Sequence, residues 1–269
     1  MAYLSLTTRD IHVLEKIKDP ESDPSSAVQI DAAQPKDPHV LDDDVYRRVS
    51  QQEREIVQSM QDLELQLAGL RPRTTTDVTG AYRKCVSRLG SLIQEHPEYA
   101  SARNNRAQAL RRLCGDSMLV TGAQQNATAQ VSILHDLNDA ERLDMAKTAL
   151  CDLDRTISLL TPTGPRPRLS PQAARTLSNA HTQRAAIYHM TSKLISSSPS
   201  PLSVDPGRRE AGWTKLEFEE NASRDFALGG RYGNEIAKGL AVSTNPTAKL
   251  CGQMVREAMK KEYGPDFGV

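Results

Sequence analysis

The 269-residue sequence predicts an all-α fold, a short solenoid of about three helix pairs with long insertions inside the pairs. Apolar residues recur at steps of three and four, which places them on one face of successive helices. Aromatic residues make up only 4% of the chain, which is low for a β-sandwich or barrel. Runs rich in Gly, Val and Ile do not alternate with the helices, so a parallel-sheet α/β fold is not expected.

Residues 1–50 form an N-terminal segment that differs from the rest of the chain. It carries ten acidic and six basic side chains, with an acidic triplet at residues 42–44. Within it we expect a short helix that Asp19-Pro20 stops, followed by an extended apolar pair. We expect this segment to be disordered or partly docked on the helices. The short helix contains Ile11, Val13, Leu14 and Ile17, and the extended pair is Val28 and Ile30.

A continuous series of amphipathic helices is predicted from about residue 45 onward. The first covers 56–67 and the second covers 82–93, because an apolar side chain recurs at every third or fourth position in each. His96-Pro97 ends the second helix. A third helix follows over 100–113 and ends at Gly115.

The second half of the chain predicts further helices with clear boundaries. The best apolar stripe covers 146–160. The next helix covers 171–194, where Ser170 can cap the first turn, and another covers 216–228. The last helix begins after Asn245 and has an apolar stripe at every fourth position, so we expect it to cap the open end of the solenoid.

These elements divide the chain into an N-terminal segment (1–50), a helical-repeat domain (51–244) and a C-terminal capping helix (245–264). Two insertions lie inside helix pairs, near 117–143 and 196–212. The first contains spaced apolar residues and can form an extra turn of helix. The second is rich in Ser, Pro and Gly, so we expect a flexible loop.

An internal repeat is present in the second helices of the three pairs once insertions are allowed. Each has a small residue followed four positions later by a large one. The small residue lets the partner helix lie close, and the large side chain fills the remaining gap between the helices. Ala107 and Ala185 occupy the matching position of the first helices. They precede their partners by 42 and 37 residues, against about 12 in an unmodified repeat. The three segments are Cys85-x3-Leu89-x2-Leu92, Ala149-x3-Leu153-x2-Thr156 and Ala222-x3-Phe226-x2-Gly229.

Several strings extend this pattern beyond a generic repeat. They are Ala100-Ser-Ala-Arg-Asn-Asn-Arg-Ala-Gln-Ala109 with Gly115-Asp116, Ala149-Leu-Cys-Asp-Leu-Asp-Arg155, Ala222-Ser-Arg-Asp-Phe226, Asn245-Pro246-x3-Leu250-Cys251-x2-Met254, and the early Val13-Leu-Glu-Lys-Ile17 and Val28-Gln-Ile-Asp31. Together they cover most of the chain outside the insertions, and they resemble the tetratricopeptide repeat protein 36 family. The resemblance implies a solenoid of tetratricopeptide (TPR) helix pairs.

Charge and composition argue against several classes of function. Lys plus Arg and Asp plus Glu number 34 each, so no global field attracts nucleic acid or membrane surfaces. The chain has no run of about 18 apolar residues and no basic-then-apolar leader, so we expect a cytoplasmic protein, with the nucleus also open. The four cysteines are widely spaced, with no Cys-x-x-Cys and no His at zinc-ligand spacing, so no metal site is expected.

The residues give little support for catalysis, and we expect neither enzyme activity nor a cofactor. The six histidines are scattered, and no Ser or Cys lies in a nucleophile elbow. His181 and His189 fall on one predicted helix, too far apart to share a metal. Gly229-Gly230-x-x-Gly233 follows a helix and lacks the Lys-Ser/Thr of a phosphate loop, so a helix C-cap explains it better. A deep pocket with two titratable residues would favour an enzyme.

Binding has more support than catalysis. Stacked helix pairs leave their first helices lining a concave face, where side chains are not needed for the core. Asn and Arg on such a wall can hold a peptide backbone or a carboxylate by directed hydrogen bonds. For any one of these residues, the alternative is an ordinary solvated helix face. The predicted protein-binding residues are Ser101, Asn104, Asn105, Gln108, Arg111, Arg112, Asn179 and Gln183.

The string Asn105-Arg106-Ala107 also matches repeat proteins that hold the acidic C-terminal tail of heat-shock chaperones. Those proteins in addition use a Lys of the first repeat and a Lys-x3-Arg pair of the third. This sequence has no such Lys in 56–67, and it has Asn179 and Gln183 at the last pair. Each missing cation removes a charge-assisted hydrogen bond that would contribute about 1.5–3 kcal/mol to binding of an acidic tail. A complete two-carboxylate clamp is therefore not expected. Binding by another surface stays open.

The leading hypothesis is a non-catalytic adaptor that docks a protein segment. The resemblance implies a chaperone partner of the seventy-kilodalton heat-shock class, and a link with tyrosine metabolism through control of a client enzyme. The alternative is a structural subunit that joins a larger complex through its convex side. An exposed apolar stripe at Leu250 and Met254 would favour this alternative, and a stripe buried on the third repeat would favour the adaptor.

Overall fold

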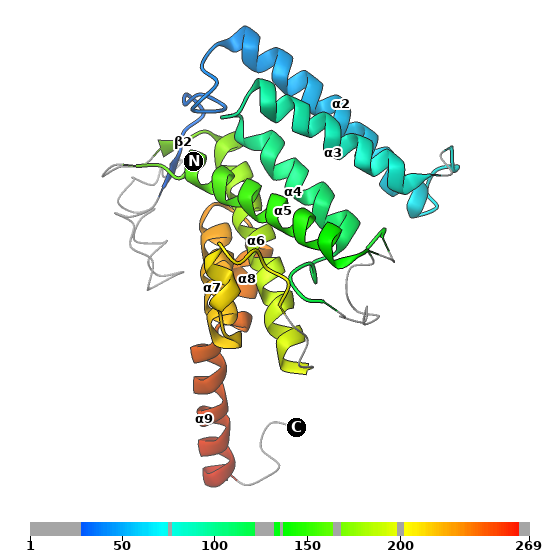
Figure 1. Cartoon of the computed structure of the whole chain (residues 1–269). Helices are drawn as coiled ribbons and strands as arrows, with labels where there is room; N and C mark the ends of the chain where they lie inside the picture. The colour runs from blue at the N-terminus through cyan, green and yellow to red at the C-terminus, as the bar shows by residue number, and fades with distance from the viewer. Residues whose placement is uncertain are drawn as a thin grey trace, which may run out of the picture.

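The computed structural model describes residues 28–74, 77–121, 132–134, 137–163, 168–197 and 202–263. Within these ranges the chain forms eight α-helices and two strands of two residues each (Figure 1). The helix predicted over 11–17 and most of the first insertion lie outside the described residues. The helices are α2 (Asp43–Leu67), α3 (Val78–Glu95), α4 (Ala100–Cys114), α5 (Asp139–Leu160), α6 (Pro171–Ser197), α7 (Lys215–Arg231), α8 (Glu235–Thr244) and α9 (Pro246–Tyr263).

The first six helices form three sequential pairs, α2 with α3, α4 with α5, and α6 with α7. Ala107 of α4 and Ala149 of α5 are fully buried in one core cluster. Ala185 of α6 is buried in another cluster with Phe226 of α7. Small side chains at these positions let the helices of a pair approach closely. The prediction of an all-α fold built from helix pairs is confirmed.

A polar contact repeats at the same place in the second and third pairs. Arg106 of α4 donates from Nε and Nη2 to Asp152 of α5, at 2.6 and 2.8 Å. Arg184 of α6 donates in the same way to Asp225 of α7, at 2.7 and 2.8 Å. Both carboxylates are buried, and a buried carboxylate is costly without a cationic partner. These contacts therefore fix how the two helices of each pair are aligned.

The two insertions pack against each other where the structure describes them. Leu202 of the second insertion forms an isolated antiparallel bridge with Val120 of the first. The backbone N–H of Ser203 donates to the carbonyl oxygen of Leu119 at 2.8 Å. The first insertion ends sooner than expected, because α5 begins at Asp139.

The expectation of a flexible loop is wrong for the described part of the second insertion. Arg208 donates to Asp154 of α5 at 2.6 Å and to Glu210 at 2.9 Å. Glu210 is fully buried and also accepts from the hydroxyl of Tyr188 at 2.6 Å. Trp213 packs edge-on against the ring of Tyr188. Buried charges and an aromatic side chain thus hold a Ser/Pro/Gly-rich segment on α5 and α6.

Helix α8 packs on α7 and is an addition to the helices expected from the sequence pattern. The contact is close because Gly229 and Gly230 lie in the last turn of α7. A Cβ on Gly230 would lie 2.8 Å from the Cα of Lys238 in α8, and a Cβ on Gly229 would lie 3.2 Å from the Cβ of Ala237. Only glycine allows the two backbones to approach this closely. The end of the third pair is therefore covered by α8.

The expectation that the last helix caps the solenoid is wrong. Helix α9 projects from the body of the molecule (Figure 1). Its apolar residues Leu250, Met254 and Val255 are 57%, 61% and 62% exposed. The helical periodicity is present, as predicted, but the stripe is not buried on the third repeat because α8 occupies that place.

Residues 28–42, which we call the N-terminal strap, lie against the starts of α4 and α6 and the end of α5. Strand β1 (Gln29–Ile30) of the strap pairs in parallel with β2 (Arg168–Leu169), just before α6. The hydroxyl of Ser170 donates to the carbonyl oxygen of Lys36 at 3.2 Å. Of the expected extended apolar pair, Ile30 lies in β1 and Val28 directly precedes it.

The strap also contacts the middle helix pair. Nε2 of His39 lies 2.9 Å from the carbonyl oxygen of Leu159 at the end of α5. Asp37 is buried and accepts from the backbone N–H of Ala100 at the start of α4, at 3.4 Å. Helix α2 then begins at Asp43, before the boundary at residue 51 set from the sequence.

Candidate functional site

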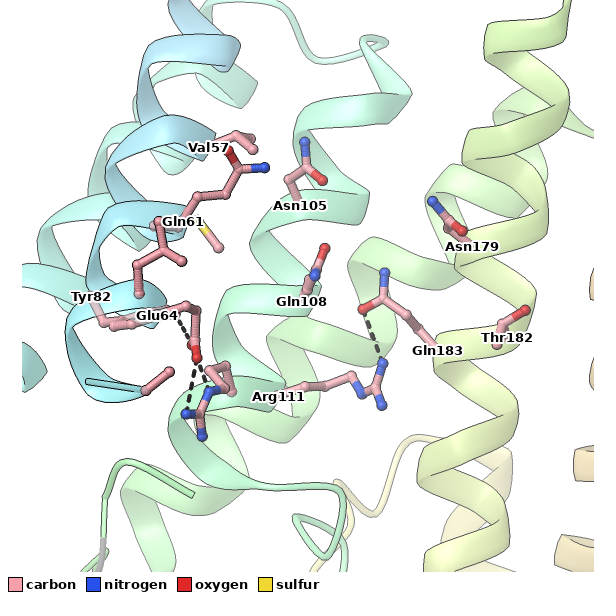
Figure 2. A pocket seen from close by; sticks show the side chains of 14 residues that line it. Val57, Gln61, Glu64, Tyr82, Asn105, Gln108, Arg111, Asn179, Thr182 and Gln183 are labelled. Atoms are coloured by element: carbon pink, nitrogen blue, oxygen red, sulfur yellow. Dashed lines mark hydrogen bonds and ion pairs between the residues drawn. The ribbon is translucent and has the colours of Figure 1, made fainter. Parts of the chain in front are cut away.

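A groove with a volume of about 900 Å³ is lined by α2, α4 and α6, with one residue of α3 (Figure 2). Helices α2, α4 and α6 are the first helices of the three pairs. Helix α2 supplies an apolar strip, whereas α4 and α6 supply mainly amide and guanidinium groups. The apolar strip consists of Val57, Met60, Leu65 and Ala68.

The eight residues predicted to bind a partner all lie along this groove or in a pocket that continues it. The smaller pocket has a volume of about 300 Å³ and shares Val57, Asn105 and Asn179 with the groove. Their binding role stays a prediction, but the structure brings them together. The groove contains Asn105, Gln108, Arg111, Arg112, Asn179 and Gln183, and the smaller pocket contains Ser101 and Asn104 together with Asn105 and Asn179.

Arg112 is held at one end of the groove. It donates from Nε and Nη2 to Glu64 of α2 at 2.6 and 3.1 Å, and the hydroxyl of Tyr82 donates to the same carboxylate (Figure 2). Burial alone would raise the pKa of Glu64, but the hydrogen bonds from Arg112 and Tyr82 outweigh it and lower that pKa. The charge of Arg112 is therefore compensated within the protein.

Arg111 is also engaged by neighbouring side chains. It donates from Nε to Asp116 at 2.8 Å and from Nη1 to Gln183 of α6 at 3.2 Å. Gln183 in turn donates to the side-chain oxygen of Asn104 at 2.8 Å. Asn104 is only 4% exposed. It therefore links α4 to α6, which corrects the expectation that it is a spare side chain on the wall.

Of the amide side chains predicted to bind a partner, two have no hydrogen-bond partner among the described residues. Gln108 lies on α4 and Asn179 on α6, and both are exposed (Figure 2). An amide side chain offers two donors and an acceptor, which is what the N–H and C=O groups of an extended peptide need. These are the predicted residues best placed to contact a partner.

The smaller pocket contains two buried carboxyl groups. Glu53 of α2 accepts from Asn105 at 2.7 Å and from the hydroxyl of Tyr99. Asp37 of the strap accepts from two backbone N–H groups. Burial raises the pKa of both groups, against the effect of these hydrogen bonds. These contacts connect α2, α4 and the strap around the pocket.

The wall supplied by α2 is absent from the predicted site. Its residues follow the buried stripe of the same helix one position later, at the same steps of four, three and four. A second stripe at this offset, containing polar residues, is the sequence signal that could have revealed it. The core-facing stripe is Ile56, Met60 and Leu63, which are buried, and the half-buried Leu67; the groove stripe is Val57, Gln61, Glu64 and Ala68, the residue after the helix.

The two histidines of α6 lie outside the groove. Nδ1 of His181 is 2.9 Å from the carboxylate of Asp225, and both are buried. His189 packs edge-on against Phe226, and burial lowers the pKa of His189 to about 4. In the described ranges no group of His, Cys, Asp and Glu could hold a metal ion. None of the described helices combines the length and hydropathy that crossing a membrane requires.

The fold and the groove define the class of protein: a helical-repeat protein whose first helices line a groove. A relative from Aspergillus fumigatus, the L-tyrosine degradation gene cluster protein hmgX, is 35% identical over 260 residues, which are 96% of this chain and 93% of the relative. Tetratricopeptide repeat protein 36 of Bos taurus is 25% identical over 253 residues, 94% of each chain. The Danio rerio protein of the same name is 26% identical over 212 residues, 79% of this chain and 75% of the relative.

The chain belongs to the tetratricopeptide repeat protein 36 family, as the resemblance in its sequence implies. The similarity to the Aspergillus and bovine proteins spans nearly their full length. No protein-family model and no solved structure matches the chain.

Proposed function

We propose that this protein is a non-catalytic adaptor that binds an extended segment of a partner protein in the groove of α2, α4 and α6. The observation that carries the proposal is the pair of unpartnered amides, Gln108 and Asn179, on neighbouring walls of that groove. Amide side chains can bind the main chain of the segment, and the apolar strip of α2 can accept its alternate side chains.

The charges of the groove limit the kind of segment that it binds. Arg111 is paired with Asp116, and Arg112 is paired with Glu64. If either arginine turned to bind an acidic peptide, Asp116 or Glu64 would be left without its cationic partner, which is unfavourable. Neither arginine is therefore available to a strongly acidic peptide. The segment in contact with α4 and α6 is therefore uncharged or weakly charged.

The proposed partners come from the family. Because the Aspergillus relative is named for an L-tyrosine degradation gene cluster, we propose an enzyme of tyrosine degradation as the client. A chaperone of the seventy-kilodalton heat-shock class is the second proposed partner, which gives the adaptor a co-chaperone role. In this proposal the protein controls the fate of the client enzyme.

Isothermal titration calorimetry tests the groove. The full chain is titrated with the purified chaperone and with each enzyme of tyrosine degradation. Replacing Gln108 and Asn179 together by Ala should weaken binding about tenfold, since a hydrogen bond contributes about 0.5–1.5 kcal/mol. The control variant replaces Gln52 and Gln58, exposed amides of α2 that do not line the groove.

Affinity for a partner that is unchanged in the groove variant would contradict binding in the groove. If none of the candidate proteins binds the wild-type chain, the proposed partners are wrong. Loss of affinity in the control variant as well would place the binding surface on α2 outside the groove.

A second function, assembly into a larger complex, is favoured by the exposed stripe of α9. A helix in a folded protein gains most of its stability from packing of its apolar face, and here Leu250, Met254 and Val255 face solvent. At its base α9 is joined to α7 by Lys249 and Glu219, 3.7 Å apart. We propose that this stripe packs against another subunit.

Sedimentation velocity tests assembly through α9. A mass above 29.6 kDa that falls to that of the monomer when Leu250 and Met254 are replaced by Ser supports self-association. Replacement of Gln253, on the polar side of α9, is the control. A wild-type chain that stays monomeric at all concentrations contradicts self-association through α9.

A further inference from the structure

A pair of arginines precedes Ser50 near the start of α2, in the string Arg47-Arg48-Val49-Ser50. Among all serines and threonines of the 269-residue sequence, Ser50 alone has basic residues both two and three positions before it. Arginine-directed serine kinases recognise this pattern, because carboxylates in their substrate clefts pair with the two guanidinium groups. The sequence around Ser50 therefore fits a kinase of this class.

The polar side chains of this string are accessible. Arg47 and Arg48 are exposed, and Ser50 is half-buried at the edge of the smaller pocket. The hydroxyl of Ser50 donates within its own helix, to the carbonyl oxygen of Arg47 at 3.1 Å. Arg47 also pairs with Asp44 at 2.9 Å, and exposed pairs of this kind contribute little. A kinase can therefore replace these contacts at small cost.

A kinase binds its substrate as an extended chain, so the first two turns of α2 must open for the reaction. The ends of helices open locally where few buried apolar side chains hold them. Among residues 43–50, Val49 is the only side chain that is fully buried, with 1% of its surface exposed. Opening of this end therefore removes one residue from the core, which is a much smaller change than opening of the whole helix.

Three cationic side chains surround Ser50 and can receive a phosphate. Arg47 lies three positions before Ser50 and Arg54 lies four positions after it, so both share a helix face with it. Lys36 of the strap lies over the same face, since its Nζ is 5.4 Å from the ring centroid of Tyr46, four positions before Ser50. Ser50, Lys36 and Arg54 line the smaller pocket together.

The charges of Lys36 and Arg54 are not compensated by a neighbouring carboxylate. Both side chains are exposed, and in the described part of the chain neither forms an ion pair. The negative groups of the pocket, Asp37 and Glu53, are buried and accept hydrogen bonds from other groups of the protein. A phosphate carries up to two negative charges and three strong acceptor oxygens, which suits these two cations.

We propose that Ser50 is a phosphorylation site for an arginine-directed serine kinase, and that its phosphate binds Lys36 and Arg54 and thereby fastens the strap to α2. In the reaction the hydroxyl oxygen of Ser50 attacks the γ-phosphorus of ATP and forms a new O–P bond. The bond from that phosphorus to the oxygen of the β-phosphate breaks, ADP leaves with the electron pair, and the hydroxyl proton passes to a carboxylate of the kinase. The proposal does not depend on what the groove binds.

The site is tested on the full chain with Mg²⁺-ATP and the catalytic subunit of cyclic-AMP-dependent protein kinase, an arginine-directed enzyme. Mass spectrometry gives the modified positions and their rates. Ser50 should be modified at least tenfold faster than any other residue. Replacing Arg47 and Arg48 by Gln should slow the modification at least tenfold, because charge-assisted pairs with the kinase are lost. Ser59→Ala removes a half-buried serine of α2 that no basic pair precedes, and it should leave the rate unchanged.

Hydrogen exchange of the strap before and after phosphorylation tests the binding of the phosphate. The backbone amides of His39 and Val40, which donate to Asp37, should exchange about tenfold more slowly afterwards, as one added charge-assisted hydrogen bond predicts. Lys36→Gln should be phosphorylated at the wild-type rate and should lose this slowing. Lys84→Gln, which changes an exposed lysine of α3 outside the pocket, should keep it.

Other results overturn the site or the phosphate contact separately. Absence of phosphate on Ser50, or equal rates for wild type and the arginine variant, overturns the site. Faster modification of Ser91 or Ser158, which have a single arginine three positions before them, overturns it as well. If phosphorylation of Ser50 leaves exchange in the strap unchanged, or slows it equally in Lys36→Gln, the phosphate does not bind Lys36.

Discussion

Replacement of Asp225 by Asn tests whether buried polar contacts hold the helix pairs together. Asp225 is 3% exposed and accepts two hydrogen bonds from Arg184. Removing one partner of a buried ion pair costs about 3–5 kcal/mol. Arg184 keeps a second carboxylate, Asp154 at 2.7 Å, so we expect the lower value, about 3 kcal/mol. For a chain of this size the melting temperature should fall by about 6–12 °C.

The free energy of unfolding is measured by urea denaturation followed by circular dichroism. Asp152→Asn should cost a similar amount, because Asp152 makes the equivalent contact with Arg106. Asp44→Asn is the control: its pair with Arg47 is exposed on α2, and such surface pairs contribute little. A loss below about 1 kcal/mol for Asp225→Asn, the range of a surface pair, would show that this contact does not hold α6 on α7.

Three further predictions use the same denaturation assay. The hydrogen bonds to Asp225 lower its pKa despite its burial, so the wild-type protein should lose the stability that this carboxylate contributes as the pH falls below about 4. The difference in the free energy of unfolding between wild type and Asp225→Asn should therefore become smaller there, and an unchanged difference at pH 3 would contradict this. The pKa of His189 is about 4 in the folded protein but near 6.5 in the unfolded chain, so the free energy of unfolding should decrease as the pH is lowered from about 6.5 to about 4, and it should decrease less in His189→Gln. The same pH dependence in the two proteins would refute this role of His189. Gly230→Ala should destabilise the protein by about 1–3 kcal/mol, because its Cβ would lie 2.8 Å from the backbone of Lys238. Gly239→Ala, which has open space around it in α8, should stabilise the protein by up to about 1 kcal/mol. Equal effects of the two substitutions would contradict the close approach of α7 and α8.

The helix pairs could be predicted from the sequence because the evidence for them is local. Apolar steps of three and four fix the buried face of each helix, and alanines such as Ala107 and Ala149 mark where helices approach closely. The same periodicity places Gln108 and Asn179 on the opposite face, so most of the groove residues on α4 and α6 follow from it.

The remaining features depend on contacts between distant residues, which periodicity does not contain. The second insertion is ordered by Arg208 binding Asp154, 54 residues away, and the strap is held by Ser170, 134 residues from Lys36. The path of α9 is set by its neighbour α8, a helix of only 10 residues that follows α7 after a short turn. A helical pattern predicts that a helix forms, and it does not predict which neighbour covers it.

Photocross-linking tests most directly whether the groove binds a partner. Benzoylphenylalanine is placed at position 108 in the groove and, in a second protein, at Lys84, an exposed residue of α3 that does not line the groove. Each protein is irradiated with the partner that binds in calorimetry, and the linked peptides are identified by mass spectrometry. We predict cross-links from position 108 to one continuous segment of the partner and none from position 84. Cross-links from position 84 alone would contradict binding in the groove.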